Sequence, residues 1–80
     1  MIPELIPVVS SNIAAVGYSD ISKTLYIQFK GRDTVYEHPG VPRETHELMM
    51  TADSIGSFYA RNVKKNYPST SSENNLRKEN

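Results

Sequence analysis

Residues 24–30 read TLYIQFK, and every second side chain of this segment is large and apolar. Leu25, Ile27 and Phe29 point to one face of an extended chain, because successive side chains of a β-strand alternate between its two faces. This period of two is typical of a strand with one buried face. The segment therefore predicts a β-strand, with Phe29 in the core.

Two more strand signals flank this segment. Residues 13–18 (IAAVGY) form a short apolar run that ends at the turn-forming pair Ser19-Asp20, and residues 34–38 (TVYEH) end at Pro39-Gly40. The intervening residues 30–33 (KGRD) supply a glycine-containing turn. Because both connections are short, we expect a small three-stranded antiparallel meander.

Two helical patterns follow the strands. Pro42 suits the first turn of a helix, where its missing N–H needs no partner. The apolar face of this helix consists of residues three and four apart, namely Thr45, Leu48, Met49 and Ala52. Asp53 or Ser54 then provides an N-cap for a second helix over residues 55–66. Its apolar stripe consists of Ile55, Phe58, Tyr59, Asn62, Val63 and Tyr67. This order predicts an α+β domain with both helices packed on one face of the sheet and Phe58 in the core.

The two ends of the chain differ from residues 9–67 in composition. Pro3 and Pro7 exclude a central strand from residues 1–8, so we expect an extended arm. This arm either lies over the domain's own apolar surface or docks on another subunit. Residues 68–80 (PSTSSENNLRKEN) contain one large apolar side chain, and we expect a disordered polar tail.

Composition excludes several classes of protein. Nine Lys and Arg residues balance nine Asp and Glu residues, so bulk charge does not hold this chain on nucleic acid. The absence of cysteine excludes disulfides, thiol catalysis and cysteine-ligated metals. No apolar run is long enough for a membrane span, and the first residues do not resemble a signal peptide, so we expect a cytoplasmic protein.

The order and spacing of the motifs resemble those of the KTSC domain family. The matching residues are Val9-Ser10-Ser11, Ile13, Val16-Gly17-Tyr18, Thr24-Leu25, Ile27, Phe29, Gly31, Tyr36, His38, Val41-Pro42, Leu48, Ala52, Ser54, Gly56-Ser57-Phe58, Asn62-Val63 and Tyr67. The resemblance covers residues 9–67. The family occurs at the C-terminus of some lysyl-tRNA synthetases and as small bacterial and viral proteins, and it implies RNA as one class of ligand. Its central Tyr-x-Tyr reads Tyr36-Glu37-His38 here, which replaces a phenol with a titratable imidazole.

Ser54, Gly56 and Ser57 lie at the expected start of the second helix. A helix N-terminus presents unpaired N–H groups and a partial positive charge, which suit an anion such as phosphate. Gly56 leaves these donors uncovered. Alternatively, Ser54 is an ordinary N-cap and Gly56 permits close packing on the preceding helix. The two interpretations are compatible.

Tyr36 and His38 are two residues apart and share one face of their strand. On an open sheet such a pair stacks a nucleobase, whereas beneath the helices it belongs to the core with its polar atoms satisfied internally. Tyr18 and Tyr26 either form an exposed aromatic pair on neighbouring strands or are half-buried. The sequence leaves both questions open.

Charge is uneven along the chain. Residues 1–58 contain four basic and seven acidic residues, a net charge of −3, whereas residues 59–80 contain five basic and two acidic residues, a net charge of +3. Arg61, Lys64 and Lys65 are spaced to share one helix face. This face is either solvated or contacts phosphate, and with so few cations any affinity for nucleic acid is modest and salt-sensitive.

No motif favours catalysis. His38 and His46 lack a spacing typical of metal ligands, and the chain has no phosphate-binding loop. We therefore expect a non-enzymatic binding module without cofactor or metal, whose ligand is RNA or a nucleotide-like molecule that it sequesters. The alternative is a protein-interaction module, such as a viral inhibitor of a host enzyme. A homo-oligomer is also compatible with the small core.

Overall fold

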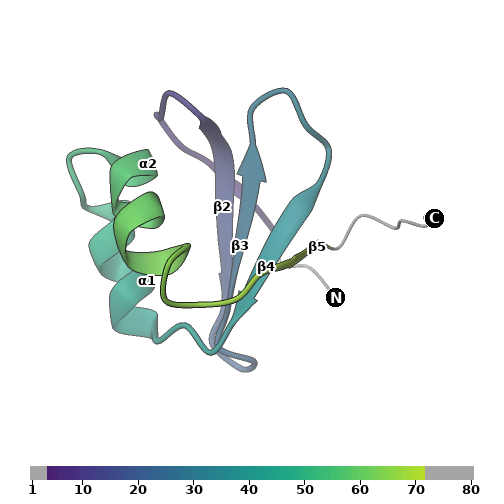
Figure 1. Ribbon diagram of the computed structural model, residues 1–80, viewed down its shortest axis with the longest axis vertical. Helices are drawn as coiled ribbons and strands as arrows, with labels where there is room; N and C mark the ends of the chain where they lie inside the picture. Colours follow the sequence, from purple (N-terminus) through teal and green to yellow (C-terminus); the bar gives the residue numbers. More distant parts are fainter. Residues whose placement is uncertain (1–3, 72–80) are drawn as a thin grey trace.

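The computed structural model describes residues 4–71. Its elements are β1 (Ile6–Pro7), β2 (Ile13–Ser19), β3 (Thr24–Phe29), β4 (Val35–Pro39), α1 (Arg43–Met50), α2 (Ile55–Phe58), the π-helical turn η1 (Tyr59–Val63) and β5 (Thr70–Ser71). The strands form one antiparallel sheet in the order β1-β2-β3-β4-β5, with the helices on one side of it (Figure 1). The α+β class, the antiparallel sheet and the two helices are confirmed.

The sheet has a short strand at each edge that the sequence did not predict. In β1, Ile6 pairs with Val16, so part of the expected arm joins the sheet at an edge, where proline is tolerated. In β5, Thr70 pairs with Glu37, so two residues that we expected in the disordered tail lie in the sheet. The remainder of the tail, residues 72–80, and the first three residues of the arm lie outside the described residues.

β3 is the central strand, and its register puts the predicted apolar face against the helices. Leu25 lies opposite Tyr18 on one side and His38 on the other. Tyr26 points to the opposite face and is only 6% exposed. Of the two interpretations of Tyr18 and Tyr26, the exposed pair is therefore wrong, because the two rings lie on different faces. Tyr18 is half-buried, as the other interpretation has it, and Tyr26 is more buried than either interpretation expected.

The core lies between this face of the sheet and the helices. Its buried members are Ile13, Val16, Leu25, Ile27, Val41, Met49, Tyr59 and Val63. Phe29 and Phe58, which we expected to be fully in the core, pack against it but are only half-buried.

In α1 the buried face is rotated from the predicted one. Pro42 is the N-cap rather than a residue of the first turn, and the helix ends at Met50, before Ala52. Met49 is fully buried, whereas Leu48 is 60% exposed. The prediction for Leu48 is wrong because the helix is oriented on the sheet so that its buried face centres on Met49. Leu48, about 100° away around the helix axis, lies outside this contact. No helix within residues 4–71 is long and apolar enough to cross a membrane.

The second helix starts at Ile55 as predicted but widens after Phe58. The N–H of Lys64 donates to the carbonyl of Tyr59, five residues earlier, at 2.8 Å. This π-type turn rotates the following side chains relative to a regular α-helix. Asn62, predicted for the apolar stripe, is exposed, and its amide donates to the Phe58 carbonyl at 3.3 Å.

Candidate functional site

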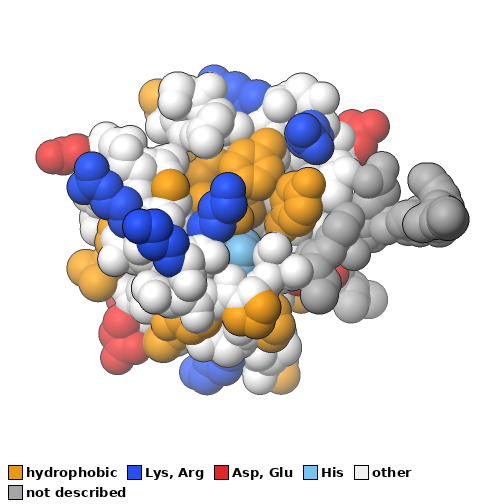
Figure 2. All heavy atoms as spheres, in the orientation of Figure 1, with side chains coloured by type: hydrophobic (Ala, Val, Ile, Leu, Met, Phe, Trp, Pro, Cys, Tyr) orange, Lys and Arg blue, Asp and Glu red, His pale blue; other side chains and the backbone are white. Residues whose placement is uncertain are grey.

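An open groove of about 550 Å³ is formed by segments far apart in the sequence. Its lining residues are Ser11, Asn12, Phe29, Lys30, Arg32, Tyr36, Tyr59, Lys64 and Ser69. Of these described residues, three are Lys or Arg and none is Asp or Glu, and we call the site the basic groove. On the face shown in Figure 2, Lys and Arg side chains surround a central group of apolar side chains.

The wall of the basic groove is aromatic. Phe29 packs edge-to-face against Tyr36, with ring centroids 5.6 Å apart, and against Tyr59 at the same distance. Edge-to-face packing is a favourable geometry for aromatic rings. The strand register explains the cluster, because Tyr36 of β4 lies opposite Ile27 of β3, two residues before Phe29. Phe29 is half-buried because it borders this groove.

His38 lies beneath the aromatic wall and is only 1% exposed. Its Nδ1 is 3.3 Å from the Tyr67 carbonyl oxygen, and its Nε2 is 2.8 Å from the Tyr59 hydroxyl. A carbonyl oxygen can only accept, so Nδ1 carries the proton of the neutral ring. Nε2 then accepts a hydrogen bond from Tyr59. The interpretation that the His38 imidazole is satisfied internally is confirmed.

Burial shifts the pKa values of both partners of this hydrogen bond. Desolvation lowers the pKa of His38, and the carbonyl contacts of Tyr67 and Pro68 oppose this shift. Desolvation also raises the pKa of Tyr59, with a further contribution from Tyr36. Both groups are therefore uncharged at neutral pH, which fixes the direction of the hydrogen bond.

Lys30, Arg32 and Lys64 surround the aromatic wall, and all three are exposed. None of them is within 4.0 Å of a carboxylate among the described residues, where both ion pairs belong to Arg43. Lys30 and Arg32 flank the turn after β3, and Lys64 caps η1. Their positive charge is thus available to an anionic ligand.

The residues predicted for the site are only partly brought together. Tyr36 and Lys64 line the basic groove, and His38 lies beneath it. Arg61 is exposed but does not line the groove, because the wide turn of η1 changes its angle to Lys64. Of the basic face that we expected from Arg61, Lys64 and Lys65, all three residues are exposed but only Lys64 lines the groove.

The start of α2 is occupied by internal contacts. The Ser54 hydroxyl accepts from the Ser57 N–H at 3.2 Å, so the N-cap interpretation is confirmed. A Cβ added to Gly56 would lie 2.5 Å from Asn12 Oδ1. Gly56 therefore permits close packing, but its nearest neighbours belong to the loop before β2 and not to the preceding helix, which the sequence analysis had named.

The sequence analysis missed most of the lining residues of the groove, namely Ser11, Asn12, Phe29, Lys30, Arg32, Tyr59 and Ser69. One available signal was the pair of cations on either side of Gly31, directly after an apolar strand. The polar residues before β2 and β5 carry no comparable local signal, since only the tertiary fold brings them to the groove.

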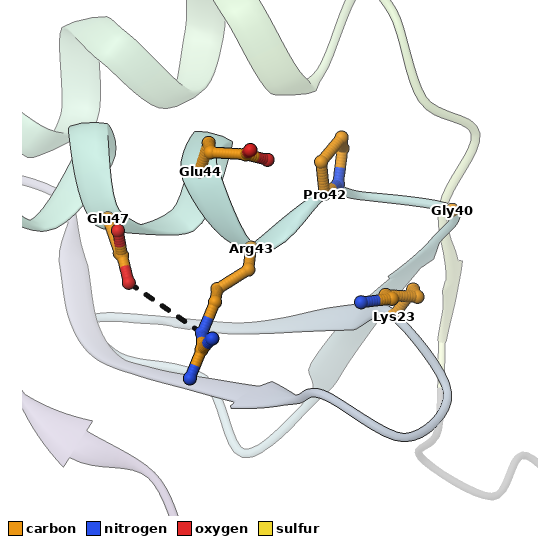
Figure 3. A pocket seen from close by; sticks show the side chains of 6 residues that line it. All are labelled: Lys23, Gly40, Pro42, Arg43, Glu44 and Glu47. Atoms are coloured by element: carbon orange, nitrogen blue, oxygen red, sulfur yellow. Dashed lines mark ion pairs between the residues drawn. The ribbon is translucent and has the colours of Figure 1, made fainter.

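Two other hollows contain carboxylates. One, of about 640 Å³, is lined by Lys23, Gly40, Pro42, Arg43, Glu44 and Glu47 (Figure 3). Another includes Glu4, Asp20 and Glu47 beside the stacked rings of Tyr18 and His46. Arg43 Nε is 3.4 Å from Asp20 Oδ1 and 3.7 Å from Glu47 Oε2, so its charge is already compensated. Residues 4–71 contain no cluster of three potential metal ligands.

Comparison with known proteins gives a consistent result for fold and family. A crystal structure of a KTSC domain protein from Yersinia pestis is similar over 84% of this chain and 93% of that chain, with 33% sequence identity and a TM-score of 0.78. No match was found among curated proteins. The sequence model of the KTSC domain matches residues 9–67, which is more than half of the chain. This chain therefore belongs to the KTSC domain family.

Proposed function

We propose that this protein is a non-catalytic binding module whose basic groove holds a phosphate-bearing aromatic ligand, either a free nucleotide or a few nucleotides of single-stranded RNA. The observation that carries the proposal is the combination of three cations and three aromatic rings in one groove, with no carboxylate in its lining among residues 4–71. Such ligands occur in the cytoplasm, which we propose as the compartment.

Charge supports this proposal. Lys30, Arg32 and Lys64 have no ion pair within the described residues, whereas Arg43 is held by two carboxylates. An unpaired cation attracts phosphate without first breaking an internal contact. The formal net charge of the whole chain is zero, so the positive lining of this groove is a local feature rather than a result of bulk charge.

The aromatic side chains support a ligand that contains a ring. Phe29, Tyr36 and Tyr59 present apolar surface to the groove. Stacking of a base on an aromatic side chain contributes about 1–3 kcal/mol, and it tolerates any base because each has a π-face. Phosphate on the cations and a base on the rings would use both parts of the groove.

The size of the groove favours a short ligand over a long polyanion. Its volume of about 550 Å³ lies within the range of small-molecule sites. Contact with about three phosphates of a single strand would make log K fall with log salt at a slope of roughly −2. A ligand with one phosphate group would show a weaker salt dependence.

The experiment measures binding of nucleoside monophosphates, a short single-stranded RNA and inorganic phosphate by calorimetry at low and high salt. We expect Lys64→Gln to weaken nucleotide or RNA binding about five-fold, which corresponds to about 1 kcal/mol. Lys65→Gln is the matched control, because Lys65 is its exposed neighbour but does not line the groove.

The arms of this experiment separate the possible ligands. Tight binding of the mononucleotides favours a free nucleotide, and binding of the RNA alone favours single-stranded RNA. Equal losses in Lys64→Gln and Lys65→Gln would contradict the groove as the site. If no phosphate-bearing ligand binds even at low salt, the proposal fails and a protein-interaction role takes its place.

A further inference from the structure

The loop before β2 holds one side chain of the basic groove in a defined orientation. Ser10 Oγ accepts hydrogen bonds from the backbone N–H of Asn12 at 3.4 Å and of Ile13 at 3.2 Å. A hydroxyl has two acceptor lone pairs and one proton. Because both lone pairs are used, Ser10 must donate its proton, and Asn12 Oδ1 receives it at 3.2 Å. The atom of the Asn12 amide that faces Ser10 is therefore the oxygen.

Gly56 provides the space for this arrangement. A Cβ at position 56 would lie 2.5 Å from Asn12 Oδ1 and 3.2 Å from Ser10 Oγ. Both distances are too short for ordinary contact, so any side chain at Gly56 would displace the Asn12 amide. The amide oxygen thus lies against α2, and Nδ2 is the branch of the side chain turned away from it.

Asn12 lines the basic groove, and within residues 4–71 its Nδ2 has no hydrogen-bond acceptor. The side chain of this lining residue is therefore oriented by Ser10 and by the space at Gly56, neither of which lines the groove, and Nδ2 is its remaining donor. Lys30, Arg32 and Lys64 are the stronger partners for phosphate, since charge-assisted hydrogen bonds are roughly twice as strong as neutral ones. If the three cations hold the phosphate, the Asn12 amide remains for an uncharged hydrogen-bond acceptor elsewhere on the same ligand.

We infer that Asn12 is a specificity-determining residue, whose Nδ2 donates to a carbonyl oxygen of the ligand's base. This inference rests on the proposed function. Uracil and guanine present a carbonyl oxygen where cytosine and adenine present an amino group. If Nδ2 meets this position of the base, it favours uridine or guanosine ligands over cytidine or adenosine ligands.

The experiment compares the affinities of uridine, cytidine, guanosine and adenosine monophosphates for the full chain and its variants. We expect the wild-type protein to prefer uridine over cytidine monophosphate, and guanosine over adenosine monophosphate, by about two- to ten-fold, the effect of one net hydrogen bond. Asn12→Ala removes this preference. Asn12→Asp replaces the donor with an acceptor and reverses it, and the affinity ratio remains the readout although the new charge weakens all four ligands.

Gly56→Ala tests the source of the orientation. We expect this change to remove the base preference in the wild-type background and to have no further effect on it in Asn12→Ala. Melting temperatures of all variants monitor folding. Should Gly56→Ala fail to fold, the Asn12 variants still decide the question, because Asn12 is exposed.

The outcomes distinguish this inference from the proposed function. If nucleotides bind in a Lys64-dependent way but without a base preference, or with one that survives Asn12→Ala, the inference is overturned and the proposed function stands. If no nucleotide binds, the proposed function fails and the role of Asn12 fails with it. Loss of the preference in Asn12→Ala and its reversal in Asn12→Asp support the inference.

Discussion

Two tyrosine–histidine pairs lie in parts of the molecule that differ in charge. Tyr59 and His38 lie beneath the basic groove, with ring centroids 5.3 Å apart, an angle of 72° and a hydrogen bond between them. Tyr18 and His46 lie beside Asp20 and Glu47, with ring centroids 4.9 Å apart and an angle of 8°, so these rings are stacked. The same two residue types thus form a fixed polar contact in one region and a face-to-face contact in the other.

The difference shows how the surroundings decide the role of a histidine. Desolvation lowers the pKa of both imidazoles. Backbone carbonyls oppose this shift at His38, whereas the carboxylates of Glu47 and Asp20 oppose it at His46. A proton on His38 would displace the hydrogen bond from Tyr59, while a proton on His46 would meet nearby negative charge. We therefore expect the structure to depend more on neutral His38 than on neutral His46.

The largest effect is expected from removing each imidazole. His38→Ala should destabilise the protein by about 3 kcal/mol, because it leaves a cavity and an unpaired Tyr59 hydroxyl in the core. His46→Ala should cost about 1 kcal/mol, since it removes a half-buried stack. Urea denaturation measures both values. Equal losses of stability in His38→Ala and His46→Ala would contradict the different roles assigned to the two histidines.

Removing each hydroxyl sharpens the comparison. Tyr59→Phe should cost about 1–2 kcal/mol, because Nε2 of His38 is left buried without a donor. It should also raise the pKa of His38, because the lost hydrogen bond favours the neutral ring. Tyr18→Phe should cost about 1 kcal/mol through loss of its hydrogen bond to the Val41 carbonyl, with no change at His38. Imidazole NMR titrations measure these pKa values, and an unchanged His38 in Tyr59→Phe would contradict the assigned bond.

Acid should destabilise the protein through His38. Its pKa is lower in the folded protein than the ordinary value of 6.5, so the unfolded chain binds more protons between these two values. Stability therefore falls as the pH decreases from about 6.5 toward the folded-state pKa, by at most about 1.4 kcal/mol per pH unit for one group. The urea midpoint should decrease with decreasing pH in the wild-type protein and also in His46→Ala, because His38 is unchanged in that variant. If the urea midpoint of a folded His38 variant, such as His38→Gln, decreases with pH as much as that of the wild-type protein, a group other than His38 is responsible.

The smallest effect is expected at Arg43. Its side chain is 62% exposed, and the side chains of its partners Asp20 and Glu47 are also more than half exposed. Such surface pairs contribute about 0–1 kcal/mol. Arg43→Gln should therefore change stability by about 0.5 kcal/mol or less and leave nucleotide affinity unaltered. A loss of affinity as large as that in Lys64→Gln would move the binding site toward α1.

Local patterns in the sequence predicted the parts of the fold that local physics controls. The alternation around Ile27 identified the central strand, and Ser54 caps the second helix as its type and position indicated. Leu48 was assigned to the wrong face of α1, because its burial depends on how the helix rotates against the sheet. The π-type turn at Tyr59 carries no local signal, and it removed Asn62 from the predicted stripe.

The candidate site was predictable only where a residue's own strand or helix sets its direction. Tyr36 and Lys64 were proposed from the sequence and do line the groove. Asn12 and Ser69 reach the same groove from loops before β2 and β5, so their contribution follows from the tertiary fold. Gly56 was interpreted either as an opening for phosphate or as a close packing contact with the preceding helix, and its missing side chain makes room for Asn12.

The central claim is that the basic groove binds a phosphate-bearing aromatic ligand, and an NMR titration with a nucleoside monophosphate tests it most directly. The account predicts that the largest backbone amide shifts occur at groove residues such as Asn12, Lys30 and Lys64, while Arg43 and Glu47 of α1 remain unchanged. Shifts centred on α1 or on the start of α2, or no shifts at saturating nucleotide and low salt, would contradict it.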